Sequence, residues 1–301
     1  MRQDLLVDFF RRQESHPECW KSNVFGVPVW PFVRMQIYFN WRSKSGVPSV
    51  FRSGLRYDPA KLRSLQSAVS HPSSTKRILF ISREDGLTDL VDNKLYDRFI
   101  SSLYLLTNST FDVSLVSVFH KKDRFDDCLD LSGLLNTYTK DVSLRVNKTD
   151  WESIEHILAE LPSELRLDLR PDTIIKQIVY FLLSRAFWSS VFETKRPDLA
   201  VTTCFYTPFL MGACAAAHSQ GLRMVDLQHG RVGYSHPIMS WWDFRHAPHT
   251  IFSLFPSEFW CWEKQNAEKI EQTWLGSSEN ITVKVFGNPW QYMRLNEVIK
   301  D

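Results

Sequence analysis

The chain has 301 residues, 44% of them hydrophobic and 23% charged, a composition typical of a globular protein. It excludes collagen-like, low-complexity and wholly disordered chains, and the length allows one large or two medium-sized domains. The 36 basic and 34 acidic side chains nearly cancel. Because a general polyanion binder needs excess positive charge, and because no zinc-finger or RNP-type pattern is present, we expect no nucleic-acid partner.

The five cysteines are scattered and odd in number, and no two of them form a C-x-x-C pair. The sequence therefore predicts neither a disulfide framework nor a zinc site, which fits a reducing cytosol. Charged residues interrupt residues 1–14, so this stretch has no signal-peptide core. The most apolar long segment, residues 174–192, contains Lys176, Gln177 and Arg185 and is too polar to span a bilayer. We expect a cytoplasmic protein.

Residues 1–75 form a predicted N-terminal extension, part irregular and part helical. A short helical pattern opens it, and an amphipathic helix is predicted from about Pro31. Residues 43–77 are rich in Gly, Pro and Ser and are predicted to be a linker. Against one acid, Asp58, this stretch carries seven basic residues: Lys44, Arg52, Arg56, Lys61, Arg63, Lys76 and Arg77. Either residues 30–77 rest on the anionic inner face of the cytoplasmic membrane, or the charges only keep a loop in solution.

From Arg77 onward, short apolar runs alternate with helical patterns. The predicted strands are residues 78–82, 111–119, 142–146, 198–204, 223–227, 259–262 and 281–286. The predicted helices are residues 92–106, 151–161, 173–192, 209–220 and 265–274. This alternation predicts an α/β fold, a Rossmann-like doubly wound parallel sheet over residues 76–290.

The loop after the first predicted strand, residues 83–86, lies where such sheets bind ligands. It has neither the G-x-G-x-x-G fingerprint of dinucleotide binding nor the P-loop pattern. Glu84 or Asp85 could act as a general base toward an incoming hydroxyl. The alternative is that these acids cap the next helix or remain in solvent.

The strand predicted at residues 223–227 stops abruptly at Gln228-His229-Gly230, and Tyr206 follows the neighbouring strand. Polar side chains at the carboxyl ends of buried parallel strands face the ligand crevice, and Gly230 allows a tight turn there. A histidine exchanges protons near neutral pH. Downstream lie a cation for phosphate, aromatic faces for a sugar ring and a second imidazole: Arg231, Tyr234, His236, Trp241 and Trp242. We interpret this region as the edge of an active site; the alternative for His229 is a structural histidine bonded to the backbone.

Four histidines fall within 21 residues: His229, His236, His246 and His249. Their spacing matches no H-E-x-x-H motif, and no neighbouring acid or cysteine completes a tetrahedral ligand set. The chain also has no G-x-S-x-G motif. We therefore predict no metal site and no hydrolase of that type.

Three groups of residues resemble a known family. The first group resembles the QHG…HP…lPdyFwcWg pattern of bacterial surface-polysaccharide glycosyltransferases. It consists of residues 226–230, Tyr234, His236-Pro237 and residues 255–262. Those enzymes act in O-antigen and capsule synthesis and have the GT-B fold. Residues 25–34 resemble the G-iWPl-R stretch near their N-termini, and residues 285–289 resemble the v-GNP sequence between their two domains.

The resemblance implies a nucleotide-sugar donor as co-substrate, no other cofactor, and a glycan or lipid-linked glycan as acceptor. It implies that His229 is the general base on the acceptor hydroxyl. From their positions in the sequence, the residues that we predict to bind substrate are Gln228, Gly230, Arg231, Tyr234, His236, Tyr206, Glu84 and Asp85. Residues 291–301 would begin the connector to a donor-binding domain. We expect the donor site to be supplied by that second domain or by a second chain.

The sequence leaves two alternatives open. One is a non-catalytic carbohydrate-binding or partner-binding remnant that keeps the sheet and the crevice without the donor site. The other is an enzyme similar to nucleotide-sugar epimerases, which share the architecture and carry a histidine at a strand end.

Overall fold

A computed structural model describes residues 3–44, 52–68, 75–83, 87–92, 94–118, 129–130, 148–161, 167, 169–230, 232, 236–277 and 279–300. The strand predicted at residues 142–146 lies outside the described residues. So do four predicted site residues: Glu84, Asp85, Arg231 and Tyr234.

The centre of the molecule is a seven-stranded parallel sheet in the order β14-β12-β10-β9-β4-β7-β8. Its strands are β4 (Arg77–Arg83), β7 (Asp112–Val118), β8 (Leu129–Asp130), β9 (Leu199–Thr202), β10 (Arg223–Leu227), β12 (Glu258–Cys261) and β14 (Thr282–Val285). The strand order reverses between β4 and β9, so the predicted doubly wound parallel sheet is confirmed.

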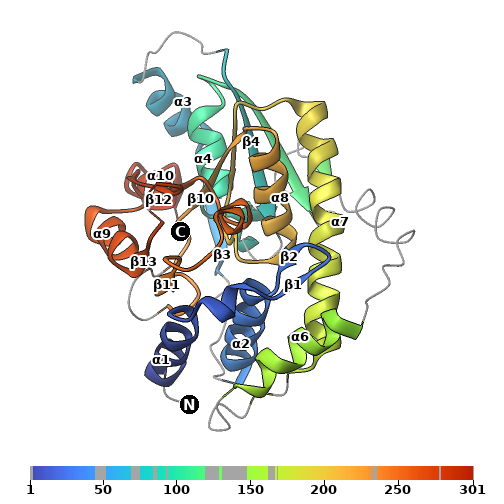
Figure 1. The fold of residues 1–301 in the computed structure, drawn as a ribbon. Coiled ribbons are helices and arrows are strands. Elements are labelled where there is room, and N and C mark those ends of the chain that lie inside the picture. The colour runs from blue at the N-terminus through green and yellow to red at the C-terminus, as the bar shows by residue number, and fades with distance from the viewer. Residues whose placement is uncertain are drawn as a thin grey trace.

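Helices cover both faces of this sheet (Figure 1). α7 (Pro171–Lys195) and α8 (Pro208–Ser219) lie on one face, and α4 (Ile100–Thr107) lies on the other with α10 (Pro289–Leu295). Alternate residues of β4 explain this arrangement, because Leu79 and Ile81 enter one buried cluster while Ile78 and Phe80 enter the second. The small residues of α8 allow close packing: a Cβ on Gly212 would lie 2.7 Å from the main-chain nitrogen of Arg185 in α7.

The remaining elements surround the sheet. The helices are α1 (Gln3–Glu14), η1 (Pro17–Trp20), α2 (Trp30–Lys44), α3 (Pro59–Ala68), α6 (Lys148–Ala159), η4 (His249–Leu254) and α9 (Lys264–Thr273). The short strands are β1 (Asn23–Val24), β2 (Val27–Pro28), β3 (Arg52–Tyr57), β5 (Leu87–Val91), β6 (Lys94–Asp97), β11 (Trp242–Asp243), β13 (Trp274–Leu275) and β15 (Ile299–Lys300). Among the described helices, none combines the length and apolarity that crossing a bilayer requires.

Two sequence-based predictions are corrected between residues 43 and 106. The predicted linker contains β3 and α3, and β3 joins a second sheet of order β15-β3-β5-β6. The helix predicted over residues 92–106 begins only at Ile100, because residues 94–97 pair with β5 as strand β6. The carboxylate of Asp97 then accepts hydrogen bonds from the main-chain nitrogens of Phe99 and Ile100, at 2.9 and 3.0 Å, and starts α4.

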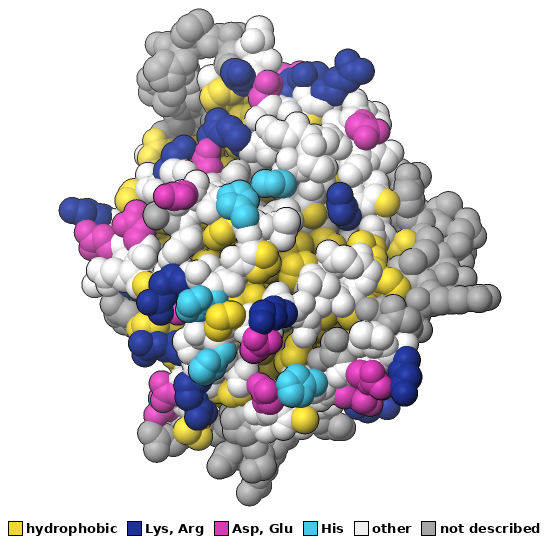
Figure 2. Space-filling view, viewed as in Figure 1, with side chains coloured by type: hydrophobic (Ala, Val, Ile, Leu, Met, Phe, Trp, Pro, Cys, Tyr) yellow, Lys and Arg dark blue, Asp and Glu magenta, His cyan; other side chains and the backbone are white. Residues whose placement is uncertain are grey.

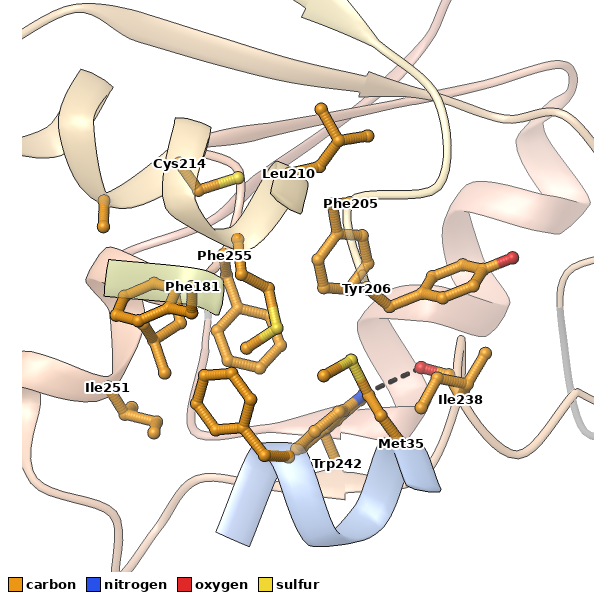
Figure 3. Close-up of a cluster of buried hydrophobic side chains, with 14 of the residues drawn as sticks. Met35, Phe181, Phe205, Tyr206, Leu210, Cys214, Ile238, Trp242, Ile251 and Phe255 are labelled. Carbon is orange, nitrogen blue, oxygen red and sulfur yellow. Dashed lines mark hydrogen bonds between the residues drawn. The ribbon is translucent and has the colours of Figure 1, made fainter. Parts of the chain in front are cut away.

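The predicted amphipathic helix is confirmed as α2, but its apolar side chains face the protein interior. Phe32 packs edge-on against Phe181 of α7, with ring centroids 5.4 Å apart. Met35 lies in the cluster that Figure 3 shows, beside Tyr206 and Trp242. The apolar face of α2 is therefore used by the core and is not available to a bilayer. The division of the chain at residue 75 stays a prediction.

Arg34 of α2 is a fully buried cation that holds a distant segment of the chain. Its side chain is 0% exposed and pairs with Glu14, the last residue of α1, which is also 0% exposed. One nitrogen, Nη2, donates to the carbonyls of Pro237 and Ser240 at 2.7 and 2.8 Å. The guanidinium also lies 3.9 Å from the ring centroid of Trp242. Residues 237–242 are thus fixed against α2 by hydrogen bonds from the Arg34 side chain to main-chain carbonyls and by its contact with the Trp242 ring.

Glu14 completes the same arrangement from the other side. Its carboxylate accepts hydrogen bonds from the indole nitrogen of Trp30 and the main-chain nitrogen of Asp243, both at 2.8 Å. Burial raises the pKa of Glu14, while the charge of Arg34 and the two N–H donors act in the opposite direction. Burial lowers the pKa of Arg34, and the charge and hydrogen bond of Glu14 act against that shift.

Replacing Glu14 by Ala should lower the free energy of unfolding by about 3–5 kcal/mol, because it leaves the Arg34 charge buried and unpaired. Urea unfolding followed by circular dichroism measures this loss. The matched control is Glu152→Ala, which removes an exposed ion pair with Lys148 on α6 and should cost less than about 1 kcal/mol. Equal losses in the two variants would contradict the structural role that we assign to Glu14.

Candidate active site at the carboxyl edge of the sheet

The candidate site lies where the strand order reverses, at the carboxyl ends of β4, β9 and β10. Parallel sheets of this topology place their ligands at this point, because the connections on either side leave in opposite directions. After β9 the chain turns sharply at Cys204, whose φ of +61° lies in the left-handed region. Thr207 then caps α8, and its side-chain oxygen accepts a hydrogen bond from the main-chain nitrogen of Leu210. The turn brings Cys204 and Tyr206 to the end of β10.

His229 is half-buried two residues beyond β10, and its ring meets the side chains of that turn. Its Nε2 atom lies 3.1 Å from the Tyr206 hydroxyl and 3.0 Å from the Cys204 sulfur. Its Nδ1 atom has no hydrogen-bond partner among the described residues. In Figure 3 the Tyr206 hydroxyl points away from the apolar cluster that holds its ring. Both contacts of the imidazole are therefore with side chains, and none is with the backbone.

The chemistry of these neighbours favours one form of the His229 ring. Burial raises the pKa of Tyr206 well above its usual value, so the phenol keeps its proton at neutral pH. The phenol of Tyr206 and the thiol of Cys204 can each donate a hydrogen to Nε2. When they donate, the ring of His229 carries its proton on Nδ1 and its lone pair on Nε2. That lone pair is what a general base requires.

His236 forms a second pair of the same kind. Its Nε2 atom lies 3.1 Å from the hydroxyl of Tyr38 in α2. Burial, the nearby His229 and the charge of Arg42 together lower the pKa of His236 to about 4. Its ring is therefore neutral at pH 7. Tyr206 of the first pair also lies close to the second: its ring centroid is 6.0 Å from that of His229 and 6.3 Å from that of His236.

Helix α2 forms one wall of the site, a placement that the sequence did not predict. Arg34, Tyr38 and Arg42 are spaced four residues apart, so they share one face of the helix. Arg34 holds the main chain beside His236, and Tyr38 bonds its ring. Arg42 is exposed and donates to the Tyr38 hydroxyl at 3.4 Å. The four-residue spacing of three polar residues in a predicted helix was the sequence signal for this shared face. No sequence signal indicated that Cys204 lies in the site.

Gln228 is engaged inside the protein. Its carboxamide oxygen accepts a hydrogen bond from the main-chain nitrogen of Trp262 at 2.8 Å, and its carboxamide nitrogen donates to the carbonyl of Gly230 at 2.9 Å. It thereby ties the end of β10 to the end of β12. Gly230 does not adopt a left-handed φ, and a Cβ there would meet no atom within 4 Å. The turn therefore has no steric need for glycine, contrary to the sequence-based argument.

Gln228, Gly230, Tyr206, His229 and His236 thus lie within one neighbourhood, but their roles in binding and catalysis stay predictions. Arg231, Tyr234, Glu84 and Asp85 lie outside the described residues. Within the described ranges, no group of three or more His, Cys, Asp or Glu side chains could hold a metal ion. His246 and His249 are exposed and take no part in the arrangement around His229.

No protein-family model and no curated protein sequence matches this chain. Among solved structures, it is similar to a putative UDP-N-acetylglucosamine 2-epimerase from Listeria monocytogenes (11% identity, TM-score 0.35, 69% of this chain and 44% of that one). It is also similar to the UDP-GlcNAc 2-epimerase from Neisseria meningitidis bound to UDP-GlcNAc (11% identity, TM-score 0.37, 74% and 52%). The match spans about half the length of each of those proteins. Because both TM-scores lie below 0.5, the fold assignment rests on the strand order of this chain.

The lowered pKa of His236 predicts a specific pH dependence of stability. Below pH 6.5 the unfolded chain takes up a proton at this histidine, whereas the folded chain does so only near pH 4. Stability is therefore lost as the pH falls through this window, by about 3 kcal/mol between pH 7 and pH 4. Urea unfolding of the native chain and of His236→Gln across this range measures the difference.

The His236→Gln variant should lack that part of the pH dependence. His246→Gln, which removes an exposed histidine, should keep it. Identical pH profiles for the native chain and the His236→Gln variant would show that His236 titrates normally, and would remove the argument for its neutral state.

Proposed function

We propose that this chain is the acceptor-side part of a glycosyltransferase of cell-surface polysaccharide synthesis. It would transfer a sugar from a nucleotide-activated donor to a glycan or lipid-linked glycan acceptor. The observation that carries the proposal is the position of His229. Its ring lies at the carboxyl end of a central strand, and its Nε2 atom lies within hydrogen-bond distance of the Tyr206 hydroxyl and the Cys204 sulfur.

The motifs of the resemblance also meet in space, which supports the proposal independently. Arg34 ends the stretch of residues 25–34, and Pro237 belongs to the His-Pro motif more than two hundred residues later. The two residues are joined by a hydrogen bond of 2.7 Å between Nη2 of Arg34 and the carbonyl of Pro237. Trp262, from the matching stretch of residues 255–262, donates through its main-chain nitrogen to Gln228. Residues that the family pattern groups along the sequence are in contact in the fold.

In the proposed reaction, His229 Nε2 accepts the proton of the acceptor hydroxyl. The hydroxyl oxygen forms the new bond to the anomeric carbon of the donor sugar as the bond from that carbon to the nucleotide phosphate breaks. Because Nε2 has one lone pair, the sugar hydroxyl must replace Tyr206 and Cys204 as its donor. The displaced phenol can then bond the incoming oxygen. A well-placed base contributes about 10²–10⁴-fold to such a step.

Donor binding would come mainly from a second domain or chain, as the resemblance implies. The departing nucleotide phosphate needs cations or helix N-termini to stabilise its charge. On the acceptor side, the described residue that offers a cation is Arg42, beside Tyr38 and His236.

Purified chain supplied with a donor-binding domain or chain should transfer sugar or hydrolyse the donor when it is incubated with a panel of nucleotide sugars and glycan acceptors. His229→Ala should reduce that turnover by about 10²–10⁴-fold, because the proton of the acceptor then has no base. The matched control is His218→Ala, which removes an exposed histidine at the end of α8 and should leave turnover unchanged. Circular dichroism checks that both variants fold.

Three outcomes would contradict the proposal. Unchanged turnover in His229→Ala would remove the base assignment. Isomerised nucleotide sugar in the absence of acceptor would indicate epimerase chemistry instead. Glycan binding with no turnover of any donor, including when a donor-binding domain is supplied, would indicate a binding remnant.

A further inference from the structure

A second cleft lies beside α1, apart from the candidate active site. It has a volume of about 770 Å³ and is bounded by α1, the segment around β11 and the end of α9. Trp241 and Trp242, predicted from the sequence to lie at the edge of the active site, line this cleft instead. Neither side chain that contacts the His229 ring is part of the lining. Figure 1 shows α1 next to β11, and in the same region of Figure 2 blue, magenta and yellow side chains alternate. The cleft is therefore a mixed surface of charge and apolar groups.

Three arginines line this cleft. Arg245 is occupied, because its Nε and Nη2 atoms hold both carboxylate oxygens of Asp243, at 2.8 and 2.5 Å. Arg11 and Arg12, in the last turn of α1, are exposed, and neither forms an ion pair with a carboxylate of the described chain. Asp8 is the one further acid of the lining. Two guanidinium groups thus remain available to planar anions, which they bind through paired N–H donors.

Trp241 gives the cleft an aromatic wall. Its φ of +65° is a left-handed conformation that costs a bulky residue about 1–2 kcal/mol. A hydrogen bond stabilises this backbone conformation, because Nη1 of Arg34 donates to the Trp241 carbonyl at 3.2 Å. The guanidinium carbon of Arg11 lies 4.9 Å from the centroid of the Trp241 ring. A strained backbone therefore presents an indole beside a cation, a combination that is typical of ligand sites.

Apolar surface completes the lining. Leu5 and Leu275, which line the cleft, are 43% and 41% exposed. A ligand that fits this surface must combine apolar faces with negative charge. Sugars that carry carboxylates have both features: the C–H face of a pyranose ring packs on an indole, and the carboxylate matches an arginine fork.

We propose that this cleft binds an anionic saccharide whose carboxylates pair with Arg11 and Arg12 and whose ring packs against Trp241. The proposal rests on the proposed function for its biological meaning, since it names the class of the acceptor glycan. The two sites lie on one continuous segment: Pro237, Ser240 and Trp241 all accept hydrogen bonds from Arg34. A glycan bound at the cleft would therefore contact the segment that also carries His236.

The test is calorimetric titration of the full chain with a galacturonic acid tetrasaccharide and with the neutral maltotetraose. The anionic sugar should bind and the neutral one should not. Arg11→Gln combined with Arg12→Gln should weaken binding by about tenfold for each arginine removed, because each loses a charge-assisted hydrogen-bond pair. Trp241→Asn should also weaken it, and asparagine tolerates the left-handed backbone.

The matched control is Arg63→Gln combined with Arg185→Gln, which removes two exposed arginines elsewhere and should leave affinity unchanged. Equal affinity in the cleft variant and this control, no binding of the anionic sugar, or equal binding of maltotetraose would overturn the proposal. So would competition by inorganic pyrophosphate at the same concentration as the sugar, because that would identify a phosphate site. His229→Ala should bind the sugar normally, so failure here is distinguishable from failure of the proposed reaction.

Discussion

The arrangement of the molecule depends on one buried ion pair, between Glu14 at the end of α1 and Arg34 in α2. Both side chains are removed from water, and a pair in that position is tolerated only when further hydrogen bonds satisfy it. Here those bonds go to main-chain groups of Pro237, Ser240, Trp241 and Asp243. The pair therefore converts the N-terminal helices into a support for a segment more than two hundred residues away. That segment begins next to His236 and ends at the cleft lined by Arg11 and Arg12.

The candidate site is built on this support. Tyr38 follows Arg34 by one helical turn, so the same helix that holds the segment also supplies a hydroxyl to His236. Tyr206 reaches His229 from the turn between β9 and α8. Each imidazole thus faces a phenol on its Nε2 atom. The lowered pKa of His236 keeps that ring neutral at pH 7, and in both pairs a phenol that donates to Nε2 leaves the proton of the ring on Nδ1.

The local pattern of apolar and polar residues predicted most strands of the sheet. It did not predict contacts between residues that are far apart in the sequence. β10 and α8 match the predicted strand and helix closely, because a buried strand and a small-residue helix have clear signatures. The predicted helix over residues 92–106 was wrong in its first half, where pairing with β5 outweighs helical periodicity. His229 and Tyr206 could be placed at one edge from the parallel topology alone. Tyr38 and Arg42 could not, because nothing in the sequence shows that α2 packs beside residues 236–243.

The central claim is that Tyr206 holds His229 with its lone pair on Nε2, ready to accept a proton. Nitrogen-15 NMR of the imidazole rings at neutral pH measures this directly, since the two neutral tautomers have distinct shift patterns. The account predicts the tautomer with its proton on Nδ1 for His229 in the native chain. A His229 ring with its proton on Nε2 would contradict the account, because that nitrogen could not then act as the base.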